Sequence, residues 1–307
     1  MKSTLKHYLP VAGLLAVLSA ASVLLCLLSG AGQGEDRPRV LATTYPLYLA
    51  AQNILGDTAE VELTLLSGVG SGCLHDYQLT PADRLAADRA LTILSNGLGA
   101  EPFLEALNVE EKIVETAAGV EALCSEHHHE EDEHHDHDHE AFNEHIWLSP
   151  ARYKQQVETV ARALHGIVGT QAILDNAAAY VAAIDRVAEG LPDLEGRPCV
   201  LFHDSLAYLA ADVGLDAKLT LSAEGESGLS AAHLAQVERL AAEHPDLLLL
   251  YDTQYPIRYA AVDGLVSADS VLALETAVVG QGQASDWLDA MRRNAGKLSK
   301  VKEGAAP

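Results

Sequence analysis

The sequence predicts an α/β protein of two lobes, each built on a mainly parallel four-stranded sheet with flanking helices. Two observations predict this fold. Short β-rich runs alternate with helix-like segments twice along the chain, which is typical of parallel sheets wrapped by helices. A long helical stretch separates the two alternations, so we expect a long, rigid helix to join the lobes. With 49% apolar and 21% charged residues among 307, the composition is that of a folded protein.

The first alternation predicts an N-terminal lobe over residues 38–168. Thr80 followed by Pro81 marks one helix start, because threonine caps helices and proline is tolerated at the first helical position. The expected strands are residues 40–45, 61–66, 91–94 and 112–115, and the expected helices are residues 47–55, 81–89 and 101–107.

The second alternation predicts a C-terminal lobe over residues 196–300, after a linking helix over residues 169–192. Two helical stretches, residues 150–167 and 171–191, precede this lobe, and in the second one apolar and charged residues recur at helical spacing. The expected strands are residues 199–202, 215–221, 247–251 and 271–274, and the expected helices are residues 205–212, 231–243, 257–266 and 286–295.

Residues 1–31 have the pattern of a secretory signal peptide. Lys2 and Lys6 precede an uncharged, apolar run over residues 11–30 that ends in small residues. A retained membrane anchor is the alternative, because such a run can span a bilayer. Cys26 follows two leucines and fits a lipoprotein cleavage site poorly. We therefore expect an exported protein in the periplasm or at the outer face of the cytoplasmic membrane.

The net charge limits the partners that the protein can bind, and the cysteines allow a disulfide. The net charge of −24 argues against binding to nucleic acid or to anionic lipid. Among the cysteines beyond the signal, Cys73 and Cys124 both lie in expected loops. In an exported protein these two can form a disulfide, and free thiols are the open alternative.

Residues 126–140 consist only of histidine and acidic residues, seven of the first and eight of the second. No apolar residue anchors this segment, so we expect a surface loop without fixed structure. Imidazoles and carboxylates are zinc ligands, so we expect the loop to bind several ions weakly. An acidic linker with incidental histidines is the alternative. The candidate weak ligands are His127, His128, His129, His134, His135, His137 and His139.

Three isolated histidines and one glutamate are candidate ligands of a tighter site. His75 follows the second expected strand, His145 precedes the first long helix, and His203 and Glu275 each follow a strand. Ligand sites in α/β proteins lie beyond the carboxyl ends of the strands. All four residues can therefore meet in a cleft between the lobes, as a four-coordinate zinc site. Taken singly, each such histidine is more often an ordinary hydrogen-bonded residue than a metal ligand.

Five short motifs along the chain carry a resemblance to a known family. They are ATTYPLY at 42–48, HDYQLTP at 75–81, NGLGAEPF at 96–103, HIWLSP at 145–150 and HDSLAYL at 203–209. These motifs resemble the metal-specific solute-binding proteins of ABC transporters, in their zinc/manganese group (cluster A-I). The resemblance covers residues 40–298, in order and with the spacing of the family, and it includes a histidine-rich insertion before the second ligand.

The resemblance implies that His75, His145 and His203 are the metal ligands. Glu275 stands where the family commonly has aspartate, which leaves water as the alternative fourth ligand. Leu74 replaces a usual proline, and the unexpected Cys73 beside it is a further possible ligand. Manganese-binding members of the family resemble this pattern but use two histidines and two carboxylates. Three imidazoles therefore favour Zn²⁺, with an affinity that falls as the histidines become protonated.

The resemblance implies a monomeric, exported receptor that captures Zn²⁺ between its lobes and delivers it to the membrane permease of an ABC transporter. We expect small tilts between the lobes. Two other functions are also compatible with the sequence. A zinc hydrolase would use an open coordination position, although the sequence has no HExxH pair and no separate general base. A zinc-storage protein or surface adhesin would need only the histidine-rich loop.

Overall fold

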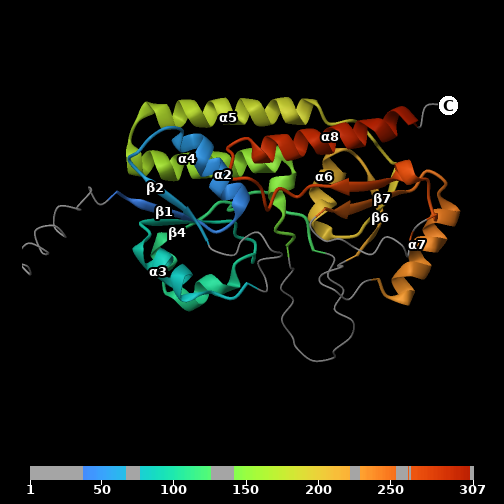
Figure 1. Ribbon diagram of the computed structural model, residues 1–307, viewed down its shortest axis with the longest axis horizontal. Coiled ribbons are helices and arrows are strands. Elements are labelled where there is room, and N and C mark those ends of the chain that lie inside the picture. The colour runs from blue at the N-terminus through green and yellow to red at the C-terminus, as the bar shows by residue number, and fades with distance from the viewer. Residues whose placement is uncertain are drawn as a thin grey trace, which may run out of the picture. The chain divides into compact units, whose positions relative to one another are not determined.

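A computed structural model describes residues 37–66, 77–125, 142–221, 229–253, 262 and 264–304. It confirms two four-stranded sheets in which every strand pair is parallel (Figure 1). The first sheet has the order β2-β1-β3-β4 and the second has the order β6-β5-β7-β8. The strands are β1 (Arg39–Ala42), β2 (Glu62–Leu65), β3 (Thr92–Ser95), β4 (Ile113–Glu115), β5 (Pro198–Leu201), β6 (Asp216–Thr220), β7 (Leu248–Asp252) and β8 (Val271–Leu274).

Helices from both halves of the chain pack against one another beside the sheets. The helices are α2 (Tyr45–Leu55), α3 (Pro81–Arg89), α4 (Pro150–Val168), α5 (Gln171–Glu189), α6 (Ala207–Asp212), α7 (Ala231–Glu243) and α8 (Asp286–Gly304). The long helices α4 and α5 contact each other and both contact α2, and α8 contacts α2 and α5 (Figure 1). Within the described residues, no helix is long and apolar enough to cross a membrane.

Several expected elements have different boundaries in the structure. The first strand ends at Ala42, because Thr44 caps the following helix by accepting a hydrogen bond from the backbone N–H of Leu47. Residues expected as a helix over 101–107 form a 3₁₀ helix, Pro102–Leu107. The expected helix 205–212 begins as a 3₁₀ turn, Asp204–Leu206, and continues as α6. The last helix is longer than expected and runs to Gly304. The expected helix 257–266 lies mostly outside the described residues.

The helix α4 starts at a sequence signal that also places a candidate ligand. Ser149 is its N-cap and accepts a hydrogen bond from the backbone N–H of Arg152, and Pro150 occupies the first turn. A buried 3₁₀ turn, Ile146–Leu148, precedes the cap and connects it directly to His145. In the second sheet, all four residues of β5 are buried, and this strand leads into His203. Both histidines are therefore attached to well-packed elements.

Glu101 is a buried carboxylate that organises the first sheet. It accepts hydrogen bonds from the Thr43 hydroxyl at 2.6 Å, from the Asn96 N–H at 2.7 Å and from the Gly97 N–H at 3.1 Å. These donors follow β1 and β3, so one side chain connects the ends of two strands. Burial outweighs these hydrogen bonds and raises the pKa of Glu101 from 4.5 to about 7.

This shift predicts a pH dependence of stability. Between pH 4.5 and 7 the folded state holds a proton on Glu101 that the unfolded state has lost, so stability falls as the pH rises through this window. We expect the free energy of unfolding of the wild type to fall by roughly 3 kcal/mol between pH 4.5 and 7, relative to that of Glu101→Gln. Urea unfolding at several pH values measures the difference. The control is Glu105→Gln, at an exposed glutamate of the same 3₁₀ helix. An equal pH dependence in wild type and Glu101→Gln would contradict the prediction.

Candidate metal centre

The structure brings together two of the histidines expected as ligands. His145 precedes α4 and His203 follows β5, and the exposed fractions of these residues are 6% and 2%. Their ring centroids lie 5.5 Å apart and the rings are nearly perpendicular. Among the described residues, His145, His203 and Asp204 form the group whose side-chain nitrogen and oxygen atoms lie close enough together to hold one metal ion. Two imidazoles at this spacing, with a carboxylate beside them, suit Zn²⁺.

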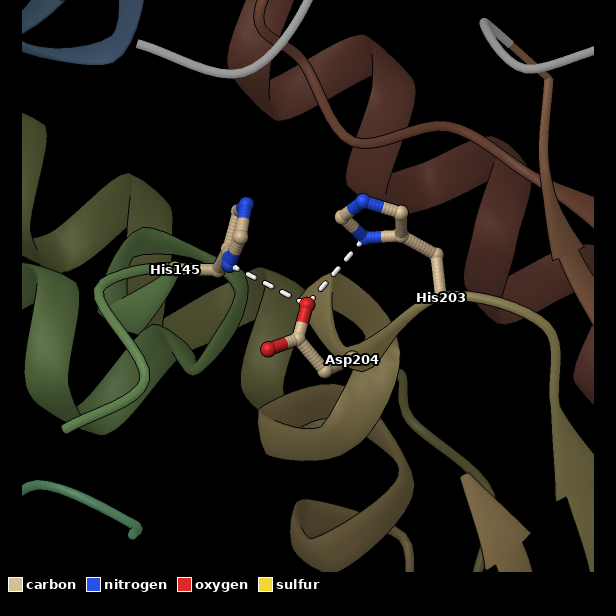
Figure 2. Close-up of side chains that lie close together, drawn as sticks. All are labelled: His145, His203 and Asp204. Carbon is tan, nitrogen blue, oxygen red and sulfur yellow. Dashed lines mark ion pairs between the residues drawn. The ribbon is translucent and has the colours of Figure 1, made fainter. Parts of the chain in front are cut away.

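Asp204 lies on one side of both rings. Its Oδ1 atom is 3.3 Å from Nδ1 of His203 and 3.9 Å from Nδ1 of His145. Figure 2 shows each ring turning one nitrogen toward Asp204 and the other away from it. The Nε2 atoms thus lie on the side opposite the carboxylate. A carboxylate beside the second nitrogen of a metal-binding histidine orients the ring and raises its basicity.

The two histidines differ in what their Nδ1 atoms contact. Nδ1 of His203 accepts a hydrogen bond from the backbone N–H of Ser205 at 3.0 Å. Nδ1 of His145 lies 3.1 Å from the side-chain oxygen of Asn143. When a metal binds Nε2 of a neutral imidazole, Nδ1 carries the hydrogen. Because Nδ1 of His203 accepts a hydrogen bond in the structure, the hydrogen of the neutral ring lies on its Nε2. Metal binding at Nε2 would require that hydrogen to move to Nδ1, where Asp204 Oδ1 is the nearby acceptor.

A second carboxylate lies beside the opposite edge of His145. Oε1 of Glu144 is 3.7 Å from Nε2 of His145, and the exposed fraction of Glu144 is only 5%. Two ligand atoms of one tetrahedral zinc lie about 3.3 Å apart, as follows from metal–ligand distances of about 2.0 Å. The distance between Glu144 Oε1 and His145 Nε2 is close to this value. Glu144 therefore places a carboxylate on the side of the ring that a metal would occupy.

The structure does not bring Glu275 into this group. Its two carboxylate oxygens accept hydrogen bonds from the Arg293 guanidinium at 2.8 and 2.7 Å, and the amine of Lys297 lies 3.9 Å away. The Arg293 hydrogen bonds hold the pKa of Glu275 below its usual value, so this side chain is ionised at neutral pH. In the structure Glu275 is therefore paired with two basic side chains of α8 and is not part of the group of His145, His203 and Asp204.

Other expected site residues lie outside the described residues. These are His75 with the neighbouring Cys73, and the histidine-rich loop over residues 126–140. The segment of residues 1–31, expected as a signal, also lies outside them. Cys124 is exposed and Cys199 is buried, and both are free thiols in the structure.

Hydrogen bonds between the two halves of the chain surround the site. The Tyr208 hydroxyl of α6 donates to the backbone oxygen of Asn143 at 2.6 Å and accepts from the N–H of Leu123 at 3.0 Å. A cavity of about 240 Å³ lies beside these contacts, and Asn143 and Asp204 contribute to its lining. The candidate ligands His145 and His203 thus lie where the halves of the chain meet.

Sequence reasoning missed Asn143, Glu144 and Asp204. Each is next to an expected ligand or two residues from it, and each is buried. Their proximity in sequence was the available signal, since polar residues flanking a buried histidine often orient it. Which of them contact the rings depends on contacts between segments far apart in the chain.

Comparisons with known proteins agree with the fold. A family model described as "Zinc-uptake complex component A periplasmic" matches residues 40–301. The zinc-binding lipoprotein AdcA of Streptococcus pneumoniae serotype 4 is 26% identical over 314 residues, which cover 96% of this chain and 61% of AdcA. The chain therefore spans less than two thirds of the length of that relative.

Solved structures support the same assignment. A crystal structure of ZnuA is 26% identical to the chain, covers 86% of it and 99% of its own length, and has a TM-score of 0.68. The solute-binding protein FpvC of Pseudomonas aeruginosa, solved with Mn²⁺, is 21% identical with a TM-score of 0.72, covering 88% of this chain and 100% of its own. At 21% identity, the similarity to FpvC supports the fold alone. Since the family model matches most of its length, the chain belongs to the ZnuA family of zinc-uptake components.

Proposed function

We propose that the chain is an extracytoplasmic receptor that binds Zn²⁺ and delivers it to the permease of an ABC transporter. The observation that carries this proposal is the meeting of His145 and His203, two buried imidazoles on different halves of the chain. Membership of a family described as periplasmic zinc-uptake components supports the location and the role. The name of AdcA, a zinc-binding lipoprotein, supports the choice of metal.

Zinc is the favoured cargo, because of the chemistry of the donors. Imidazole suits zinc, whereas manganese prefers oxygen ligands and lies low in the affinity order. In the proposed site, His75 joins His145 and His203, and a carboxylate or water completes four-coordination. The direct test is to strip the protein of metal, reload it in competing Zn²⁺ and Mn²⁺, and measure its metal content. Preferential loading with Mn²⁺ would reject zinc as the cargo.

Removal of one histidine should weaken the tight site without unfolding the protein. We expect His203→Ala to lower zinc affinity by orders of magnitude, because the site loses one of few strong donors. A chelator competition measures this effect, and circular dichroism tests the fold. The matched control is His233→Ala, at an exposed histidine of α7. Tight one-to-one binding that survives the combined alanine substitution of His75, His145 and His203 would refute the assignment.

Glu275 remains the sequence-based candidate for the fourth ligand, and we expect Glu275→Gln to lower zinc affinity less than loss of a histidine does. Arg293→Ala should not weaken zinc binding, because it frees the carboxylate that Arg293 holds. The zinc affinity of Glu144→Gln provides the comparison, because Glu144 is the carboxylate beside Nε2 of His145. A zinc-bound structure decides the question, since a ligand oxygen must lie about 2.2 Å or less from the ion. A longer distance between the ion and both carboxylate oxygens of Glu275 would exclude Glu275 as the fourth ligand.

The loop over residues 126–140 is proposed to collect zinc near the tight site. Fixing it around a metal costs conformational entropy of roughly 1–2 kcal/mol per residue, so its sites should be weaker than the site on folded elements. The flanks of the loop are close together, because Cys124 and Phe142 form a β-bridge and the Asn143 N–H donates to the Leu123 oxygen at 2.9 Å. A deletion closed by a short linker is therefore feasible.

We expect deletion of residues 126–140 to remove the weak zinc equivalents in a titration and to leave the single tight equivalent. In cells, uptake should suffer mainly when zinc is scarce. The control replaces the same residues with a glycine-serine segment of equal length, which keeps the connection but removes the ligands. Loss of the tight equivalent in a folded deletion variant would mean that the loop supplies a primary ligand.

A further inference from the structure

Asn143 lies two residues before His145, and its exposed fraction is 1%. All of its polar groups have partners on other residues. Its backbone N–H donates to the Leu123 oxygen, and its backbone oxygen accepts from the Tyr208 hydroxyl. In its side chain, Nδ2 donates to the backbone oxygen of Asp204 at 2.8 Å, and Oδ1 accepts from the backbone N–H of His145 at 2.9 Å.

Two of these contacts independently determine the orientation of the Asn143 amide. The backbone oxygen of Asp204 can only accept, so the group facing it must be the NH₂. The backbone N–H of His145 can only donate, so the group facing it must be the carbonyl oxygen. Both contacts require the same orientation, and an amide flipped by 180° would lose both hydrogen bonds.

This orientation determines the tautomer of the His145 ring. Nδ1 of the ring lies 3.1 Å from the Asn143 carbonyl oxygen, which carries no hydrogen. The hydrogen of that bond must therefore belong to Nδ1, which leaves the lone pair of the neutral ring on Nε2. Nε2 is the nitrogen that is turned away from Asp204 (Figure 2). It lies 3.7 Å from Oε1 of Glu144.

We propose that Asn143 is a positioning residue that fixes His145 in the Nδ1–H tautomer, so that Nε2 presents its lone pair to the incoming zinc ion. Asn143 itself supplies no ligand atom. The amide is held in this orientation by the backbone of Asp204, which belongs to the second half of the chain. Contact between the lobes therefore reinforces an orientation that the His145 N–H also favours from within the first half of the chain. The proposal deepens the proposed function and rests on it for the identity of the metal.

The experiment compares Asn143→Ala with Asn143→Asp. Alanine removes the acceptor for Nδ1–H, whereas aspartate keeps an oxygen in its place. We expect Asn143→Ala to lower zinc affinity about tenfold to hundredfold, the usual effect of losing a partner that orients a metal ligand. Asn143→Asp should recover part of that loss. The matched control is Asn53→Ala, because Asn53 also donates across the molecule, from α2 to the Ala284 oxygen, and should leave affinity unchanged.

A spectroscopic measurement separates this role from a purely structural one. Nitrogen chemical shifts of isotope-labelled histidine distinguish the two tautomers, and the His145→Ala variant assigns the signal of His145. In the zinc-free protein we expect the Nδ1–H form in wild type and Asn143→Asp, and a mixture in Asn143→Ala. Thermal unfolding of each variant checks that it is folded.

Two outcomes would overturn the proposal. One is an Asn143→Ala variant with unchanged affinity and an unchanged tautomer. The other is equal weakening in the alanine and aspartate variants while His145 keeps the Nδ1–H form in both, which would indicate a structural role only. If the wild type bound no zinc tightly, the proposed function would fail. The tautomer signal would then decide the role of Asn143 by itself.

Discussion

The candidate site depends on one constraint, which is that two candidate ligands, one before α4 and one after β5, must be held together by buried contacts between the lobes. Trp147 provides the central contact. Its indole Nε1 donates to the Thr276 oxygen at 2.9 Å, and its backbone oxygen accepts from the indole of Trp287 at 3.0 Å. All three residues are buried, and loss of either hydrogen bond would leave polar groups without water to replace it. Because His145 is only two residues away, these bonds place it relative to the second sheet.

A second set of hydrogen bonds between the halves of the chain connects α2 with the N-terminus of α8. Asp286 accepts hydrogen bonds from the Tyr45 hydroxyl and from the backbone N–H groups of Gln281 and Gln283. Burial and this carboxylate raise the pKa of Tyr45 to about 12, so its hydroxyl remains a donor at neutral pH. Because contacts at two separate places join the halves of the chain, wide opening would break the two buried Trp147 bonds and the part-buried Tyr45–Asp286 bond together. These contacts support the expectation of small tilts between the lobes.

The sequence predicted the parts of the site that depend on local pattern. The apolar run of β5 ends just before His203, and Ser149-Pro150 marks the start of α4, so both ligands could be placed at the ends of elements. The contacts that orient the His145 ring could not all be predicted, because one of them, the bond between Asn143 and Asp204, joins residues 61 positions apart. The pairing of Glu275 with Arg293 was also hidden, since helical periodicity does not show which face of α8 meets β8.

The two candidate ligands differ in the tautomer that their buried partners favour. The Asn143 oxygen beside Nδ1 of His145 favours a hydrogen on Nδ1 and leaves the lone pair on Nε2. Nδ1 of His203 instead accepts from the Ser205 N–H, which favours a hydrogen on Nε2. Metal binding at Nε2 of His203 would therefore require its hydrogen to move to Nδ1, beside Asp204, whereas His145 would need no such change. The proposed site thus combines one imidazole that is already in the binding tautomer with one that must exchange a hydrogen-bond partner when metal binds.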